Sequence, residues 1–332
     1  MAKVLITTVP FGENTRLPFE LLEKARIEYL VNPLGKKLTE NEVAHMVRDY
    51  DAIIAGTEPI TDKVLESAKN LKMISRVGIG LDSVNLNSAK TRGINVSYTP
   101  DAPAPAVAEL TIGLILNLLR SVHISNTQMH QGLWNRYLGR RLEEVTIGII
   151  GVGRIGRFLL RKTKGFGISK ILVNDISPNR ELDNEFKLEW TAKENIYKEA
   201  DIITLHLPLT HLTRNMILKK ELQEMKRDAI LINTSRGGII NELDLYHVMK
   251  TGHLSGAAID VFEQEPYKGP LSDLDRCLLT AHMGSMSIDC RAKMELEATE
   301  EVVRFFSGKT LEGEVPEAEY DEQNQNYNLE LN

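Results

Sequence analysis

The chain has few cysteines, no long uninterrupted apolar run and no excess of basic charge, and each absence excludes a class of protein. Its 332 residues include only 2 cysteines, Cys277 and Cys290. Two thiols are too few for a disulfide scaffold or a cysteine-rich metal site, so no metal is expected. So low a cysteine content favours a reducing, cytoplasmic location.

The apolar segments are short. The most apolar stretch, residues 107–119, contains Glu109 and Asn117 and is shorter than the roughly 20 residues that cross a bilayer. The N-terminal apolar segment is too short for a signal peptide and has the pattern of a first β-strand. The net charge of −6, with acids and bases interspersed, lacks the basic footprint of a nucleic-acid-binding protein. Neither a membrane nor nucleic acid is expected as a partner.

Short runs rich in β-branched residues alternate with longer helical patterns along most of the chain. Such alternation is typical of βαβ units that build a parallel sheet. A length of 332 residues with 42% hydrophobic content is enough for two domains with cores of their own. The expected strands are residues 4–6, 52–54, 73–75 and 94–96, and then 146–150, 170–174, 202–205, 229–233, 256–260 and 278–281.

A glycine-rich turn stands between an expected strand and an expected helix in the middle of the chain. Gly151 permits a tight turn, Gly153 lets a pyrophosphate approach the backbone, and Gly156 allows close packing of helix on strand. The backbone N–H groups of Arg154 and Ile155, with the helix dipole, suit an anion. A lone G-x-G-x-x-G is a weak signal, but its position between strand and helix is the one that dinucleotide binding requires.

Asp175 ends the next expected strand, at the spacing of the acid that binds the ribose hydroxyls of a dinucleotide. Its charge would repel a 2′-phosphate, which favours NAD over NADP, although the nearby Arg180 weakens this preference. A glycine-rich turn without a ligand is the alternative. The combination of strand, glycines, helix and acid favours NAD(H) as the cofactor.

The position of this turn predicts how the domains are connected. A helical pattern around residues 104–130 is expected to carry the chain into a second domain, and the chain is expected to return after residue 289. The predicted fold class is therefore α/β with two doubly wound parallel-sheet domains. A Rossmann NAD-binding domain, residues 104–289, is inserted into a flavodoxin-like substrate domain, residues 1–103 and 290–332.

The two C-terminal segments differ in pattern. Residues 292–307 are amphipathic, with Met294, Ala298 and Val302 on one side, so they are expected to form a docked helix. Residues 312–332 are acidic, rich in Asn and Gln and weakly patterned. This tail is expected to be mobile or loosely docked.

Three chemically active side chains follow expected strands of the second domain, at the sheet edge where α/β proteins bind ligands. Taken singly, each residue also has a role without catalysis. Arg236 could form a surface ion pair, and His282 could be purely structural. Glu265 precedes Pro266 and has Glu263 as a competing choice. Together the three types suit reduction of a ketone, which needs a proton donor, a partner for that donor and a cation near the developing charge.

These three segments, the glycine turn and residues 205–210 resemble the D-isomer-specific 2-hydroxyacid dehydrogenases. That family includes phosphoglycerate dehydrogenase, hydroxypyruvate reductase and D-lactate dehydrogenase, and the resemblance runs from about Ala52 to about Phe306. It implies NAD-dependent hydride transfer between a small 2-oxo acid and its D-2-hydroxy acid. It also implies a homodimer, formed through residues 123–141 with Trp134 and Tyr137.

By this resemblance His282 is the proton donor, Glu265 its partner, and Arg236 the anchor of the substrate carboxylate. Asp260 would hold the nicotinamide carboxamide. The cofactor contacts that the resemblance adds to the glycine turn and Asp175 are Thr111, His206, Pro208, Thr234, Ser235, Asp260 and Gly284.

In the first domain, residues 75–82 resemble the family's substrate loop. Backbone N–H groups of Ile79 and Gly80 would bind the substrate carboxylate, with a plain glycine-rich turn as the alternative. Many phosphoglycerate dehydrogenases have a cationic pair after the second strand of this domain. Here Glu58 stands in that region and would oppose a phosphate, which disfavours phosphoglycerate.

Two other functions stay open. The first is an NAD(H)-binding regulator or corepressor on the same fold, which can retain the Arg, Glu and His set. The second and weaker one is oxidation of a small anion such as phosphite or formate. An assay with several 2-oxo acids separates an enzyme from a regulator.

Overall fold

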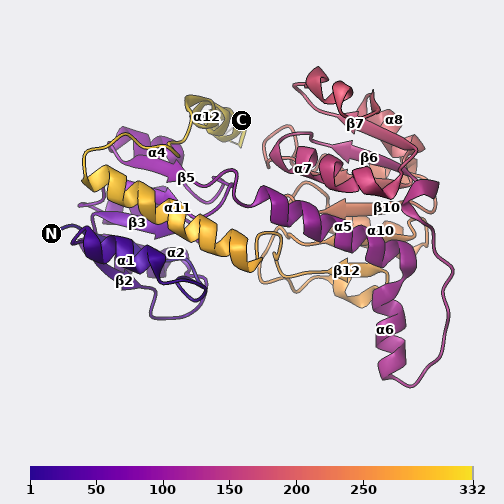
Figure 1. Cartoon of the computed structure of the whole chain (residues 1–332), viewed down its shortest axis with the longest axis horizontal. Helices are drawn as coiled ribbons and strands as arrows, with labels where there is room; N and C mark the ends of the chain where they lie inside the picture. The colour runs from indigo at the N-terminus through magenta and orange to yellow at the C-terminus, as the bar shows by residue number, and fades with distance from the viewer. Residues whose placement is uncertain (331–332) are drawn as a thin grey trace. The chain divides into compact units, whose positions relative to one another are not determined.

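The computed structural model of the protein describes residues 1–330 and divides into two compact units. Unit 1 is Met1–Pro103 together with the chain from Ser285 onward, and unit 2 is Ala104–Gly284. The chain therefore returns to unit 1 at Ser285, somewhat earlier than the expected return after residue 289. Each unit is an α/β layer structure with its own parallel sheet (Figure 1).

Unit 1 contains a five-stranded sheet in the order β2-β1-β3-β4-β5. All four strand pairs are parallel, and this order is the flavodoxin one. β1 is buried on both faces, as expected for a covered parallel strand. The strands are β1 (Lys3–Ile6), β2 (Glu28–Val31), β3 (Ala52–Ala55), β4 (Met73–Arg76) and β5 (Asn95–Tyr98).

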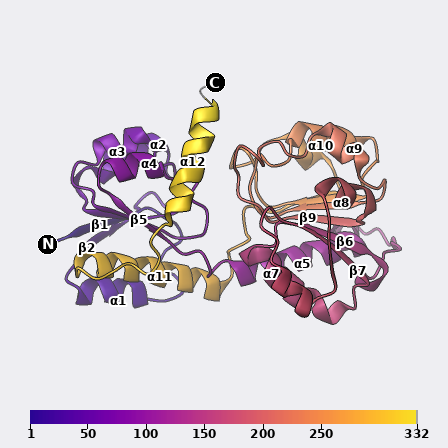
Figure 2. The same cartoon turned by 90° about the horizontal axis from the view of Figure 1, so that it is seen from above.

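Helices cover both faces of this sheet (Figure 2). α1 (Leu17–Lys24) and α11 (Ile288–Phe306) lie together on one face, where the Ser75 hydroxyl in β4 donates a 2.8 Å hydrogen bond to the Ala298 carbonyl of α11. The helices of the other face are α2 (Glu40–Met46), α3 (Asp62–Ser67) and α4 (Leu86–Thr91).

Unit 2 contains a seven-stranded parallel sheet in the order β12-β11-β10-β9-β6-β7-β8. Counted from β6, this is the classic dinucleotide-binding order with one strand added beyond the sixth. The expected fold class is confirmed. The strands are β6 (Thr146–Ile150), β7 (Lys170–Asn174), β8 (Leu188–Trp190), β9 (Ile202–Leu205), β10 (Ile230–Asn233), β11 (Gly256–Ile259) and β12 (Cys277–Leu279).

The helices of unit 2 also form two layers, with α5 and α7 on one face and α8, α9 and α10 on the other (Figure 2). Buried residues of α5 and α7 form one hydrophobic cluster with β6, β9 and β10, and those of α8 and α10 join a second cluster on the opposite face. The helices are α5 (Ala104–Arg120), α7 (Arg154–Thr163), α8 (Lys193–Glu199), α9 (Lys219–Glu224) and α10 (Glu242–Lys250).

The helical segment expected around residues 104–130 is helical but is not one continuous helix. It is two helices, α5 and α6 (Val122–His130), bent by 66° at Ser121. The backbone of Ser121 is in the left-handed region, with φ of 50°, which no α-helix continues through. α6 leaves the sheet and is followed by an extended segment, residues 131–141 (Figure 1). Among residues 1–330 no single helix is long and apolar enough to cross a membrane. Only this bent pair, taken together, has the length and composition of a membrane-spanning segment.

The acidic C-terminal segment is docked on unit 1, contrary to the expectation of a mobile or loosely held tail. The backbone N–H of Tyr98 in β5 donates to the carbonyl of Gly313 at 2.9 Å, and that of Val315 donates to Val96 at 3.0 Å. These bonds place residues 313–315 along the free edge of β5. Hydrophobicity along the sequence does not reveal such an edge contact, because it is made by backbone groups.

Helix α12 (Glu317–Glu330) then packs beside α4. The Gln323 side chain accepts a hydrogen bond from the backbone of Leu86 at 2.7 Å and donates one to the carbonyl of Val84 at 2.8 Å. Tyr320 is buried in the same cluster as the core of unit 1. The last two residues of the expected tail, 331–332, lie outside the described part of the chain.

Candidate active site

The glycine turn joins β6 to α7 at the carboxyl edge of the seven-stranded sheet. Gly151 has φ of +94°, and a Cβ there would overlap the carbonyl oxygen of His206. A Cβ on Gly156 would overlap the carbonyl oxygen of Gly151, so strand and helix approach closely at this point. Gly153 is the N-cap of α7, has open space around it and supplies no side-chain cap. The first N–H groups of α7 thus face an open cradle that fits a pyrophosphate.

Asp175 lies just beyond β7, beside this turn. Its Oδ2 accepts a hydrogen bond from the backbone N–H of Val152 at 2.7 Å, and its Oδ1 accepts one from that of Ser177 at 2.9 Å. Each carboxylate oxygen retains a further lone pair. The group is therefore fixed beside the glycine turn, where it fits the ribose hydroxyls of a dinucleotide.

His206 follows β9 and is buried. Its Nε2 lies 3.0 Å from the Thr204 hydroxyl, while its Nδ1 is buried without a hydrogen-bond partner among the described residues. Burial lowers the pKa of His206 to about 3, so the ring is neutral at ordinary pH. A buried nitrogen without a partner fits a site that a ligand completes. Pro208, two residues on, is exposed, and its carbonyl accepts a 2.6 Å hydrogen bond from the Thr213 hydroxyl.

Thr111 and Thr234 meet inside unit 2. Their hydroxyl oxygens lie 2.9 Å apart, and the Thr111 hydroxyl also donates to the Val107 carbonyl one helical turn earlier in α5. Thr111 is fully buried. These contacts fix α5 against the end of β10, and contact of either residue with a cofactor stays a prediction.

The loop that carries Arg236 is organised by Asn233 at the end of β10. The Asn233 Oδ1 accepts hydrogen bonds from the backbone N–H of Ser235 at 3.1 Å and from its hydroxyl at 2.7 Å, and Nδ2 donates to the Arg236 carbonyl at 2.8 Å. The Arg236 guanidinium donates to the Ser235 carbonyl at 2.7 Å. Asn233 is not among the site residues that the sequence predicts. The available signal was an Asn two residues before a serine, a common turn pattern.

His282 and Glu265 are paired. The ring Nδ1 of His282 lies 3.0 Å from both carboxylate oxygens of Glu265. Because Nδ1 donates its hydrogen bond to the carboxylate, Nε2 is the ring nitrogen that remains for contact with a substrate. Glu263, the competing choice, is exposed, and its backbone N–H donates to the Glu242 carboxylate at 2.8 Å. The structure therefore brings Glu265, and not Glu263, to the histidine.

Asp260 holds the loop that carries His282. Its Oδ1 accepts from the Thr280 hydroxyl at 2.6 Å and from the Met283 N–H at 2.7 Å, and its Oδ2 accepts from the Gly284 N–H at 2.9 Å. The carboxylate is 1% exposed. The sequence pattern predicts only a nicotinamide contact for Asp260 and does not reveal this loop contact, because the three donors follow it by more than nineteen residues.

In unit 1 the loop after β4 offers unpaired donors. The Gly78 N–H donates to the Thr99 hydroxyl at 2.7 Å, which fixes the start of the loop. The backbone N–H groups of Ile79 and Gly80 make no hydrogen bond within residues 1–330. In the same range no group of three or more His, Cys, Asp or Glu is arranged to hold a metal.

The chain is similar in sequence and structure to known dehydrogenases and reductases. Residues 112–284 match the family model described as the D-isomer specific 2-hydroxyacid dehydrogenase, NAD binding domain. The chain is 36% identical to D-3-phosphoglycerate dehydrogenase of Methanocaldococcus jannaschii over 95% of its own length, but spans only 59% of that protein. It is 32% identical to hydroxypyruvate reductase of Thermotoga maritima, over 85% of this chain and 95% of that one. The structure of D-lactate dehydrogenase of Aquifex aeolicus, complexed with NAD and lactic acid, is similar with a TM-score of 0.81 and 25% identity, over 92% of this chain and 96% of that one.

Proposed function

The chain belongs to the D-isomer-specific 2-hydroxyacid dehydrogenase family, and on this basis we propose how its own residues perform the reaction. It is an NAD-dependent oxidoreductase that interconverts a small 2-oxo acid and the D-2-hydroxy acid. The observation that carries the proposal is the pairing of His282 with both oxygens of Glu265. When bound, NADH supplies the hydride for the 2-oxo carbon.

His282 is the proposed proton donor. With Nδ1 bound to Glu265, the protonated ring presents its N–H at Nε2, and the neighbouring carboxylate stabilises the cationic form. During reduction the Nε2 proton passes to the substrate carbonyl oxygen, which becomes the hydroxyl of the product. In the reverse direction neutral Nε2 accepts the hydroxyl proton.

Arg236 is the proposed anchor of the substrate. Its guanidinium can bind a carboxylate through two N–H groups and lower the energy of charge that develops on the carbonyl oxygen. The open N–H groups of Ile79 and Gly80 supply the second proposed contact to the substrate carboxylate.

The proposed cofactor contacts follow the geometry of unit 2. Gly151, Gly153 and Gly156 shape the turn for the pyrophosphate, and Arg154 and Ile155 offer their N–H groups there. Asp175 receives the ribose hydroxyls and disfavours a 2′-phosphate. The remaining proposed contacts, on the nicotinamide side and around β9, are Thr111, His206, Pro208, Thr234, Ser235, Asp260 and Gly284.

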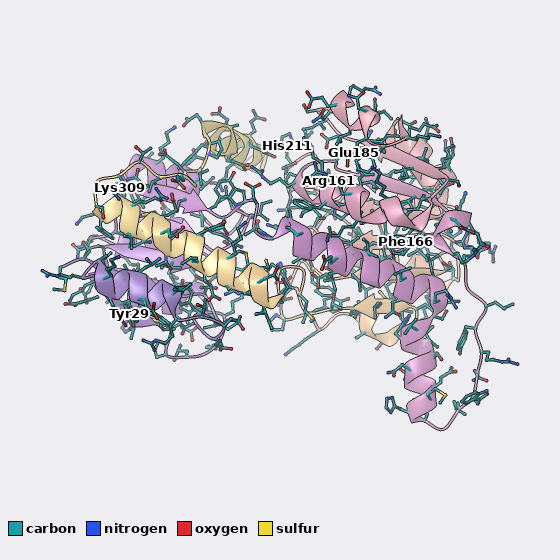
Figure 3. The ribbon with its side chains drawn as sticks, viewed as in Figure 1. Tyr29, Arg161, Phe166, Glu185, His211 and Lys309 are labelled. Atoms are coloured by element: carbon teal, nitrogen blue, oxygen red, sulfur yellow. The ribbon has the colours of Figure 1, made fainter. Side chains whose placement is uncertain are left out.

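The active form is proposed to be a homodimer built on the arm of α6 and residues 131–141. α6 buries none of its residues, and the side chains of the arm stand clear of the sheet (Figure 3). Trp134 is 78% exposed and Leu138 fully so. Large apolar side chains gathered on one exposed segment are characteristic of an interface. The others on the arm are Val122, Met129, Leu133 and Tyr137.

The proposed location is the cytoplasm, and no nucleic acid or membrane partner is proposed. Cys277 and Cys290 are both free and buried, and burial raises the pKa of their thiols to about 12 and about 11. Buried thiols of this kind are inert and fit a reducing compartment.

The test is oxidation of NADH with glyoxylate, hydroxypyruvate, pyruvate, 2-oxoglutarate and phosphohydroxypyruvate, repeated with NADPH. The proposal expects turnover of one or more of these acids with NADH, a weaker rate with NADPH and a D-2-hydroxy acid as product. Binding of NADH without turnover of any acid would contradict the proposal and favour a regulatory protein on the same fold.

A further inference from the structure

Glu58 occupies the loop that follows β3 in unit 1, and its carboxylate is turned inward. The side chain is 2% exposed. Its Oε1 accepts hydrogen bonds from the Thr7 hydroxyl at the end of β1 and from the Gly56 N–H, the latter at 2.8 Å. The carboxylate is thus fixed between the ends of β1 and β3 and does not extend into solvent.

A cation lies under the neighbouring loop. Arg76 is the last residue of β4 and is 7% exposed, and its Nη1 donates to the Val77 carbonyl. A Cβ on Gly78, which has φ of +134°, would overlap this Nη1 atom. The guanidinium therefore lies against the backbone that leads to the open N–H groups of Ile79 and Gly80.

The two loops are neighbours by the pairing of their strands. Ala55 in β3 is the register partner of Arg76 in β4, and the Val77 N–H donates to the Ala55 carbonyl at 2.8 Å. Parallel strands lie about 4.8 Å apart, and Glu58 and Ile79 each stand three residues beyond the paired positions. One loop therefore carries a fixed cation and open donors, and the adjacent loop carries a fixed carboxyl group.

We propose that Glu58 sets the substrate class by selecting 2-oxo acids whose side chain carries no second anionic group. This inference rests on the proposed function, in which Ile79 and Gly80 take the substrate carboxylate. When the substrate carboxylate is bound at Ile79 and Gly80 near Arg76, the side chain of the substrate lies in the electrostatic field of Glu58. Burial limits solvent screening of that field, so a second carboxylate or a phosphate is disfavoured.

The deciding variant is Glu58→Gln. Both hydrogen bonds to Glu58 end on the same oxygen, so the carbonyl oxygen of glutamine can accept both while the charge is removed. The measured quantity is the ratio of kcat/KM for a neutral-chain acid to that for an anionic one. Two pairs serve, 2-oxobutyrate with oxaloacetate and hydroxypyruvate with phosphohydroxypyruvate. The matched control is Thr7→Val, which removes one hydrogen bond but leaves the Glu58 carboxyl group.

In the wild type the neutral acid of each pair is expected to be preferred. Glu58→Gln is expected to lower that preference about tenfold in both pairs, the effect of removing one charge at close range in a protein. Thr7→Val is expected to leave the preference as in the wild type.

Other results overturn the inference. An unchanged ratio in Glu58→Gln would mean that the Glu58 carboxyl group does not select between the two acids. An equal change of the ratio in both variants would mean that only loop packing matters. Wild-type protein that turns over none of the four acids would instead count against the proposed function, so the two failures are distinguishable.

Discussion

Two carboxylates with different tasks hold His282, the proposed proton donor, in place. Glu265 binds its ring, while Asp260 binds three donors of the loop from Thr280 to Gly284. The backbone of His282 has φ of 51°, a conformation that is uncommon for residues other than glycine. The three hydrogen bonds to Asp260 hold the loop on both sides of His282 in that conformation.

His282→Ala is expected to reduce turnover by roughly 10²–10⁴, because it removes the proposed proton donor. NADH binding, followed by fluorescence titration, is expected to persist, since the glycine turn and Asp175 are untouched. Wild-type turnover in this variant would remove His282 from the mechanism.

A second pair of variants separates the two glutamates. Glu265→Gln is expected to lower turnover because the ring loses its carboxylate partner, and Glu263→Gln, which alters an exposed side chain, is expected to keep the wild-type rate. The reverse order of rates would show that the observed pairing is not the catalytic one.

His206 predicts a particular acid sensitivity. Its folded pKa is lowered to about 3, whereas an unfolded histidine binds a proton near pH 6.5. Below pH 6.5 the unfolded state therefore binds more protons, and stability falls as the pH falls towards 3. From this group alone the loss between pH 7 and pH 5 is about 2 kcal/mol.

The measurement is urea unfolding at the two pH values, followed by tryptophan fluorescence. Both tryptophans of the chain, Trp134 and Trp190, lie in unit 2 together with His206. His206→Gln is expected to lose part of the acid sensitivity, and the exposed His130→Gln is expected to retain all of it. Equal pH dependence of all three proteins would contradict the prediction.

Among the secondary-structure elements, the structure of the C-terminal segment differs most from what its sequence pattern predicts. Residues 313–315 bond to the edge of β5 through the backbone, and α12 adds the buried ring of Tyr320. An exposed sheet edge invites pairing with other chains, and this segment covers it. The polar sequence does not indicate this docking, because among residues 312–325 only Val315 and Tyr320 are buried.

Tyr320→Ala is expected to destabilise unit 1 by about 2–4 kcal/mol, because it removes a buried aromatic ring from the core cluster. Hydrogen exchange of the β4 and β5 amides measures the change. The exposed neighbouring variant Asp321→Ala is the control and is expected to exchange as the wild type does. Identical protection in both variants would mean that α12 does not stabilise the sheet.

The whole molecule is proposed to act as a pair of chains. Trp134→Glu combined with Leu138→Glu places two charges on the exposed apolar arm, so this variant is expected to be monomeric. Sedimentation equilibrium at micromolar concentration is expected to give two 37.3 kDa chains for the wild type and one for the variant. Leu243→Glu, at an exposed apolar position on α10, is the control and is expected to remain dimeric. A monomeric wild type would contradict the homodimer.

Much of this protein follows from short stretches of sequence. The strand periodicity predicts two parallel sheets, and the central position of the glycine turn predicts that one domain interrupts the other. The motifs around Arg236, Glu265 and His282 point to the reaction. Each of these signals spans a few neighbouring residues, so a local pattern is enough to carry it.

Other features depend on residues far apart in the chain. The choice of Glu265 over Glu263, the loop contacts of Asp260 and the inward turn of Glu58 are set by which strand ends become neighbours in a sheet. The break at Ser121 and the docking of α12 likewise have no strong local signal. Helix and strand patterns record which face is buried, but the direction of a loop side chain is decided by the donors and acceptors that folding brings to it.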